Sequence, residues 1–178
     1  MRKLKMEELG RLSPQAFKAA PKTPVVLVLD NVRSALNVGS AFRTADAFAL
    51  EQVILCGITA QPPHREILKT ALGASESMDW RYFPQTTEAI EALKAEAYTV
   101  LAIEQAEGSD LLDQFHGSDG SKYALVFGNE VKGVVQEVVS ASDAVVEIPQ
   151  FGTKHSLNIS VSAGVCVWDF WQKLKVVQ

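Results

Sequence analysis

The sequence predicts one α/β domain built on a mostly parallel sheet flanked by helices. From residue 25 onward, short apolar runs rich in Val, Ile and Tyr alternate with segments whose apolar residues recur at helical spacing. This alternation is typical of parallel strands joined by helical crossovers. The chain has 178 residues, 47% hydrophobic and 21% charged. That composition favours a single folded domain and argues against disorder over most of the length.

Six apolar runs are the predicted strands. Each is rich in β-branched or aromatic residues, which favour a pleated and buried surface. In chain order they are residues 25–30, 52–56, 80–83, 98–103, 122–127 and 144–148.

Two core helices are predicted between these strands, over residues 37–49 and 86–96, because each shows one apolar face. The face of the first is made of Val38, Ala41, Phe42, Ala45 and Phe48. The second opens on the cap candidates Thr86 and Thr87. Its buried residues are expected to be Ala89, Ile90 and Leu93.

A last helix is predicted over residues 157–174. Its apolar stripe has spacings of four, four, three and three and consists of Leu157, Val161, Val165, Trp168 and Trp171. Packing on the sheet is the default expectation for each aromatic residue. The stripe equally fits a surface that a partner subunit covers.

The first 23 residues form a predicted basic arm ahead of a domain that spans residues 24–178. Residues 1–22 hold six Lys or Arg and two Glu, a net charge of +4, whereas the remainder carries 11 basic and 19 acidic residues, a net charge of −8. A basic arm on an acidic body fits an RNA contact. The alternative is a solvated helix near residues 6–12 followed by a linker over 14–24.

Several classes of protein are disfavoured. No apolar stretch approaches the length of a membrane span, and the basic start runs into Glu7 and Glu8 rather than a signal core. We therefore expect a cytoplasmic protein with no membrane contact. Cys56 and Cys166 lie far apart and are expected to be buried. The three histidines have no ligand spacing, so no metal is predicted.

Three loops that follow predicted strands are unusually polar. They cover residues 30–43, 127–133 and 148–158, and open α/β sheets bind ligands at such strand ends. No GxGxxG follows a strand, and the glycines at 128 and 133 are followed by Val134 and Val135 where a P-loop needs Lys and Ser or Thr. These absences disfavour a P-loop NTPase and a dinucleotide-binding oxidoreductase. A missing GxSxG disfavours an esterase.

Five polar residues in these loops are the candidate catalytic residues: Asn37, Arg43, Glu130, Ser156 and Asn158. Each has a structural alternative. Asn37 fits the N-cap of the 37–49 helix, Glu130 fits a helix start, and Ser156 and Asn158 fit caps of the last helix. Arg43 fits a snorkelling or paired side chain. Their convergence on one edge of the sheet is what favours a functional site.

The same loops resemble a known family in three motifs. Residues 37–46 read NVGSAFRTAD, residues 127–133 read FGNEVKG, and Ile148-Pro149 is followed by SLNIS at 156–160. Together they resemble the SpoU class, or TrmH family, of RNA ribose 2′-O-methyltransferases in the SPOUT superfamily. The resemblance covers roughly residues 24–172. It implies a parallel sheet with a deep C-terminal trefoil knot, S-adenosylmethionine as cofactor and an RNA substrate.

The resemblance also implies a cofactor site held largely by backbone groups. Its residues would be Ile103, Gly128, Asn129, Glu130, Ile148, Gln150, Ser156 and Leu157. Gln150 departs from the apolar residue, often Met, that the family carries after the Ile-Pro pair. That departure concerns its side chain rather than a backbone contact.

For catalysis, the resemblance implies that Arg43 acts on the nucleophilic hydroxyl. A guanidinium stays protonated at neutral pH and accepts a proton poorly. Two options remain open: an RNA phosphate takes part in the proton transfer, or Arg43 stabilises the developing alkoxide. Histidine is chemically better suited than arginine to act as a base, which makes His155 a further candidate, although the motif does not require it.

The other residues would have supporting roles. Asn37 would orient the ribose or Arg43, and Glu130 would position that arginine or the cofactor amine. Ser156 and Asn158 would shape the pocket. The family also implies a homodimer with the active site at the subunit interface, where Arg43 serves the partner's cofactor.

The substrate class follows only in part. Few residues precede the resembling region, which favours tRNA over rRNA. The main rival function is a non-catalytic RNA-binding protein that has kept the knotted fold. All five candidate catalytic residues are intact, which disfavours that rival.

Overall fold

The computed structural model describes residues 1–118 and 120–174. Within them lies a seven-stranded sheet with the order β3-β2-β1-β6-β4-β7-β5, in which every pair of strands is parallel. The strands are β1 (Thr23–Asp30), β2 (Leu50–Cys56), β3 (Trp80–Phe83), β4 (Tyr98–Ile103), β5 (Asp110–Leu111), β6 (Lys122–Phe127) and β7 (Ala144–Glu147). The mostly parallel α/β fold and all six predicted strands are confirmed. The two-residue β5 was not predicted.

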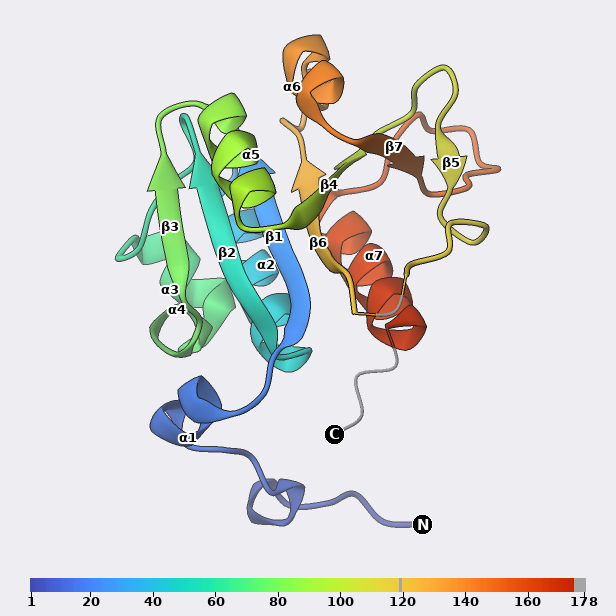
Figure 1. Cartoon of the computed structure of the whole chain (residues 1–178). Coiled ribbons are helices and arrows are strands. Elements are labelled where there is room, and N and C mark those ends of the chain that lie inside the picture. Colours follow the sequence, from blue (N-terminus) through green and yellow to red (C-terminus); the bar gives the residue numbers. More distant parts are fainter. Residues whose placement is uncertain (119, 175–178) are drawn as a thin grey trace.

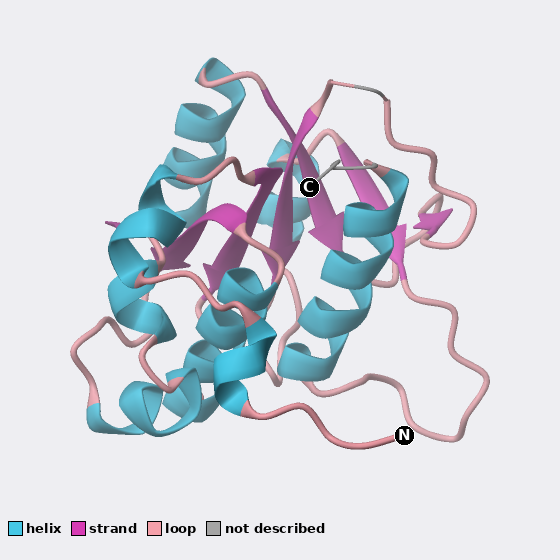
Figure 2. Ribbon diagram, turned by 90° about the horizontal axis from the view of Figure 1, so that it is seen from below, coloured by secondary structure: helices cyan, strands magenta, loops and turns pink. Residues whose placement is uncertain are grey.

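Helices cover both faces of the sheet (Figures 1 and 2). They are η1 (Met6–Leu9), α1 (Pro14–Ala19), α2 (Ala35–Ala47), α3 (Arg65–Ala71), α4 (Ala74–Ser77), α5 (Thr86–Ala95), α6 (Gln136–Ala141) and α7 (Ile159–Lys173). One core cluster joins the sheet to α2, α3 and α7, and a second joins it to α5 and α6. The short helices α1, α3, α4 and α6 were not predicted, and α1 lies inside the predicted linker.

The central strands of the sheet bury mainly apolar side chains. In β1, residues 25–28 have no solvent exposure, and Leu27 pairs with Leu125 of β6. The two cysteines, Cys56 and Cys166, are free and buried, as predicted. Burial raises the pKa of both thiols to about 12, so they act as small apolar residues and not as nucleophiles.

Two predicted helix caps are wrong. α2 begins at Ala35, and its N-cap is Ser34, whose Oγ accepts a hydrogen bond from Asn37 N. Asn37 is therefore inside the first turn of the helix. α5 has Gln85 as its N-cap. The Thr86 hydroxyl instead donates to the buried carboxylate of Asp30, at 2.5 Å. In both cases a residue one to three positions earlier takes the extended cap conformation.

The glycine in the middle of α2 permits a close helix contact. A Cβ on Gly39 would lie 2.1 Å from Thr70 Oγ1 and 2.4 Å from Ile67 O of α3. Only glycine lets the two helices approach this closely. The contact fixes α2, which carries Asn37 and Arg43, against its neighbour.

α7 has two apolar faces, one buried and one exposed. One face is buried in the core and consists of Ala163, Cys166, Val167 and Phe170. The other face carries Val161, Val165 and Trp168, which are 51%, 39% and 49% exposed. Trp168 stacks on the half-buried Trp171, and both rings meet Phe48 near the end of α2. Core packing, the default expectation, is therefore wrong for Trp168.

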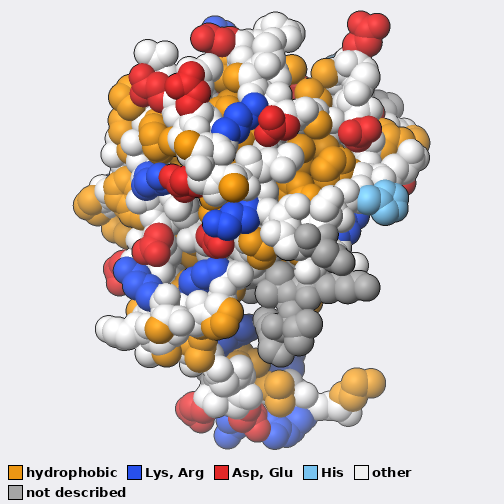
Figure 3. Space-filling view, in the orientation of Figure 1, with side chains coloured by type: hydrophobic (Ala, Val, Ile, Leu, Met, Phe, Trp, Pro, Cys, Tyr) orange, Lys and Arg blue, Asp and Glu red, His pale blue; other side chains and the backbone are white. Residues whose placement is uncertain are grey.

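The N-terminal residues lie beside the body of the molecule (Figure 1). Residues 1–5 and 7–16 are exposed. Charged side chains of both signs gather at the lower end of the molecule in Figure 3. Arg2 pairs with Glu8 at 2.6 Å, so part of the positive charge is neutralised locally. Among the residues that the structure covers, no helix is long and apolar enough to cross a membrane.

The strand order brings three loops to one place. β6 lies between β1 and β4, and β7 lies on the far side of β4. Because all these strands run parallel, the loops that leave β4, β6 and β7 emerge at the same edge of the sheet. The loop between β1 and α2 emerges beside them.

Candidate functional site

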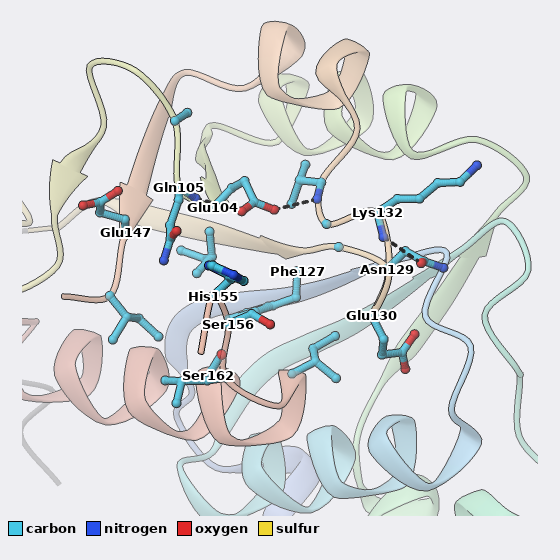
Figure 4. Close-up of a pocket in the computed structure, with 18 of the residues that line it drawn as sticks. Glu104, Gln105, Phe127, Asn129, Glu130, Lys132, Glu147, His155, Ser156 and Ser162 are labelled. Carbon is cyan, nitrogen blue, oxygen red and sulfur yellow. Dashed lines mark hydrogen bonds between the residues drawn. The ribbon is translucent and has the colours of Figure 1, made fainter. Parts of the chain in front are cut away.

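A cavity of about 730 Å³ lies at the carboxyl ends of β4, β6 and β7 (Figure 4). Its walls come from residues 103–106 after β4, residues 127–134 after β6, and the segment between β7 and α7. The volume is within the range of small-molecule sites, and the position is where parallel sheets bind ligands.

All eight residues predicted to bind a cofactor line this cavity: Ile103, Gly128, Asn129, Glu130, Ile148, Gln150, Ser156 and Leu157. They lie on three separate loops. The sequence pattern thus located the walls of a real cavity, although their roles in binding stay predictions.

The loop after β6 turns back on itself within a few residues. The backbone groups of Asn129 and Gly133 exchange two hydrogen bonds, of 2.8 and 3.0 Å. The Asn129 side-chain oxygen accepts from Val131 N and Lys132 N inside the turn. A Cβ on Gly128 would lie 2.1 Å from the Gly133 carbonyl carbon. Position 128 therefore requires glycine, because two backbone segments meet there.

Glu104, directly after β4, fastens the same loop from the other side. One of its carboxylate oxygens accepts from Val134 N at 2.9 Å, and the other accepts from Gln105 N at 2.8 Å. Figure 4 shows Glu104 in the cavity wall, with a dashed line marking its hydrogen bond to the loop after β6. The sequence analysis missed Glu104. Its position after a predicted strand was the available signal, but a single exposed-looking carboxylate gave no reason to select it.

Glu130 binds the start of α2 rather than a helix of its own. The prediction that it lies at a helix start is wrong, because the next helix, α6, begins at Gln136. Its carboxylate accepts from Arg33 N at 2.9 Å, Ser34 N at 3.0 Å and Asn37 Nδ2 at 3.1 Å. The charge therefore faces the positive end of α2 from a loop more than 90 residues away.

The electrostatic state of Glu130 follows from these contacts. Partial burial raises its pKa, but the hydrogen bonds donated by Arg33, Ser34 and Asn37 outweigh burial and hold the pKa below its ordinary value. Glu130 is therefore a carboxylate at neutral pH. It acts as an acceptor and a negative charge, and not as a proton donor.

Asn31 ties the two loops together at a second point. Its carbonyl accepts from Asn129 Nδ2 at 2.8 Å. Asn31 has a φ of 53°, a left-handed conformation that Asn tolerates better than most residues. Its side chain is held by Asp30 Oδ1 and by Ile58 N. The sequence analysis did not select Asn31, because the contact depends on a backbone angle.

Asn37, Glu130 and Asn158 form one hydrogen-bonded group. Asn158 Nδ2 donates to Asn37 Oδ1 at 3.4 Å, while Asn37 Nδ2 donates to Glu130. Asn158 is also the N-cap of α7, where its side chain accepts from Ser160 N, which confirms the predicted cap. All three predicted loops thus meet here.

Arg43 does not join that group. It is exposed on α2 and is not among the residues that line the cavity. Ser156 lines the cavity but does not cap α7. One chain therefore brings together four of the five predicted catalytic residues and leaves Arg43 apart from them.

Further polar residues, none of them among the predicted catalytic or cofactor-binding residues, line the cavity: Glu104, Gln105, Lys132, Glu147 and His155. Glu147 accepts a hydrogen bond from Ser109 at 2.9 Å. His155, considered as a base, lies in the wall beside Ser156 (Figure 4). The walls thus offer carboxylates and one cation around a ligand-sized space.

Comparison with known proteins gives a consistent result. A model of the SpoU rRNA Methylase family matches residues 24–168. A 23S rRNA (guanosine-2′-O-)-methyltransferase of Neisseria meningitidis is 31% identical over 142 residues, which cover 80% of this chain and 56% of that protein. This chain thus spans little more than half the length of that relative.

Two of the similar solved structures differ in the share of their own length that the match covers. An rRNA methyltransferase of Sinorhizobium meliloti with bound AdoMet is 27% identical with a TM-score of 0.79, and the match covers 92% of this chain and 62% of that one. A protein studied for 2-OH methylation of C/U34 on tRNA is 26% identical with a TM-score of 0.74. In that case the match covers 84% of this chain and 95% of the other.

Proposed function

This chain belongs to the SpoU rRNA Methylase family, and we propose that it transfers the methyl group of S-adenosylmethionine to a ribose 2′-hydroxyl of RNA. One observation carries the proposal: two of the three family motifs line one ligand-sized cavity, and the first motif is hydrogen-bonded to both of them through Asn37. The AdoMet-bound relative from Sinorhizobium meliloti supports the choice of cofactor.

The residues of the cavity fit this cofactor. S-adenosylmethionine would supply a sulfonium-bound methyl group as the electrophile. The backbone of 128–134 and 148–150, together with Ile103, Ser156 and Leu157, would hold it. Glu104 and Glu147 give this wall negative charge, which suits a cationic ligand. Glu130 and Asn37 would keep the loops in the binding arrangement.

Catalysis would consist mainly of positioning. Asn37 and Asn158, already hydrogen-bonded to each other, would orient the ribose at the edge of the cavity. Ser156 would shape the pocket between cofactor and substrate. The charge of Arg43 would stabilise the developing alkoxide, or an RNA phosphate beside it would take up the proton.

We further propose a homodimer in which Arg43 serves the cavity of the second copy. The exposure of Arg43 outside its own cavity supports this arrangement. The exposed apolar face of α7, with Val161, Val165 and Trp168, offers a surface for the second copy. It lies beside α2, because Trp168 packs on Phe48.

The chain path fits a trefoil knot, which we include in the proposal. From β7, on the far side of β4, the chain passes the cavity through residues 148–158 and continues into α7, which packs against α2 and β1. The close meeting of Gly128 with the backbone of Gly133 lies in the same region. Such threading is rare among proteins.

The RNA class and the arm complete the proposal. We favour tRNA over rRNA, supported by the similarity to the protein linked to C/U34 of tRNA, nearly all of which is matched. Residues 1–23 would form an RNA-contacting arm ahead of the catalytic domain, which begins at residue 24. The last four residues of that domain lie outside the described residues. The proposal includes a cytoplasmic location, where such RNA substrates would be available.

The decisive experiment is transfer of labelled methyl from S-adenosylmethionine to total RNA of a strain that lacks this gene. The wild-type chain should label a 2′-O-methyl nucleoside, and the size of the labelled RNA should identify its class. Arg43→Ala should abolish transfer and still bind the cofactor in calorimetry. An Arg43→Ala chain that stays fully active would exclude the assigned role of Arg43.

The shared site has its own test. Arg43→Ala and Glu130→Ala chains are mixed after partial unfolding and refolding together. Mixed dimers hold one site with both residues intact, so activity should recover to about one quarter of wild type. No recovery in confirmed mixed dimers would place Arg43 in the site of its own chain.

A further inference from the structure

A second hollow, of about 310 Å³, adjoins the cofactor cavity. It lies within the segment that joins β7 to α7 and is lined by Pro149, Gln150, Phe151, Gly152, Thr153, Lys154, Ser156 and Leu157. Three of these residues, Gln150, Ser156 and Leu157, also line the larger cavity. The two hollows therefore share a wall, and a group in one lies next to a ligand in the other.

Phe151 is the most unusual residue of this hollow, because its side chain is 97% exposed. All residues from 151 to 158 are exposed. Among the described residues, no hydrogen bond holds any part of 149–157. An aromatic ring on an unheld segment beside a ligand cavity has little role in the stability of the fold.

The chemistry of the lining fits a nucleotide. Pro149, Phe151 and Leu157 offer apolar surface for the face of a base. Gln150, Thr153 and Ser156 offer donors and acceptors for its edge, and Lys154 offers a cation for a phosphate. Proteins recognise RNA mainly by splaying out single-stranded bases and stacking them on aromatic rings. The exposed apolar face of α7 is the surface proposed for a second copy of the chain, so that contact does not require Phe151.

We propose that this hollow holds the base of the nucleotide that is methylated, stacked on Phe151, with Lys154 at its phosphate. The inference rests on the proposed function and deepens it. It makes the 149–157 segment the substrate side of the site and Phe151 a determinant of RNA binding. The substrate would then present an unpaired nucleotide at the methylated position.

The first test needs no catalysis. Phe151→Trp places a fluorophore in the hollow, and wild type, with Trp80, Trp168 and Trp171, is measured in parallel. Short mixed-sequence single-stranded RNA should quench the variant more than wild type, whereas fully paired RNA should not. Equal quenching in both proteins would overturn the proposal. A positive result with no methyl transfer in any assay would leave the subsite standing and reject the proposed reaction.

The second test is kinetic and uses total RNA from the deletion strain. Phe151→Ala should raise KM for RNA about tenfold, as expected for one lost stacking contact, with kcat and cofactor affinity unchanged. Phe151→Trp should restore KM. Leu72→Ala, which truncates an exposed residue at the end of α3, is the matched control with wild-type KM. Dissociation of the Phe151→Ala dimer in sedimentation would instead identify a subunit contact and overturn the proposal.

Discussion

The two walls of the cavity differ in how firmly they are held. The 128–134 loop is fixed by Glu104 from one side, by Asn31 and the start of α2 from the other, and by its own turn. The 149–157 segment has no hydrogen bond among the described residues, and its residues 151–157 are all exposed. A held wall costs no ordering when a small ligand binds, whereas a free wall adapts to a varied one. The difference fits the proposal that the held wall binds the cofactor and the free wall binds the RNA.

Two glycine substitutions should show the largest difference in stability between the two walls. Gly128→Ala should lower the free energy of unfolding by about 3 kcal/mol or more, because its Cβ would collide with backbone. Gly152→Ala, in the free segment, meets nothing within 4 Å and should change stability by less than about 0.5 kcal/mol. Urea unfolding measures both. Equal effects would show that the walls do not differ in packing.

Glu104→Gln tests the outer fastening of the held wall. Gln offers one acceptor where Glu offers two, so either Val134 N or Gln105 N loses its partner. We expect the free energy of cofactor binding and the free energy of unfolding to fall by about 2 kcal/mol in total. In kinetics, KM for S-adenosylmethionine should rise more than kcat falls. Glu107→Gln, three residues along the chain and outside the cavity lining, is the control. An unchanged cofactor affinity contradicts the fastening role.

Glu130→Ala tests the inner fastening. It removes three charge-assisted hydrogen bonds to the start of α2, but the site is exposed, so we expect roughly 1.5 kcal/mol, or about tenfold in kcat/KM. Calorimetry with S-adenosylmethionine separates two roles. Weaker binding places Glu130 in the cofactor site, and unchanged binding limits it to the orientation of Asn37 and α2.

The smallest expected effect is the pH dependence of the same carboxylate. Its pKa in the folded protein is lower than in the unfolded chain, so its stabilisation is complete above the ordinary pKa of glutamate, about 4.3, and is lost as the pH falls below that value. The stability difference between wild type and Glu130→Gln should therefore be constant from neutral pH to about pH 5 and shrink in more acidic solution. A difference that grows on acidification would reverse the assigned direction.

Local sequence patterns predicted the strands well, because a mostly apolar run such as 122–127 is buried in the sheet whatever the order of the strands. They predicted the walls of the cavity because the motifs follow strand ends. The patterns failed where the role of a residue depends on a contact with a residue far away in the sequence. Asn37 resembles a cap, yet Ser34 takes that position and Glu130 binds the Asn37 side chain from 93 residues away. Asn31 depends on a backbone angle that no spacing reveals.

The position of β6 in the sheet has a consequence for the newly made chain. β6 fills the gap between β1 and β4, and Val25 pairs with Tyr123. During synthesis the edge of β1 that pairs with β6 therefore stays unpaired until almost three quarters of the chain has been made. Pairings of such long range close slowly. We expect the nascent protein to rely on chaperones over this interval, and a chain cut before β6 to aggregate rather than fold.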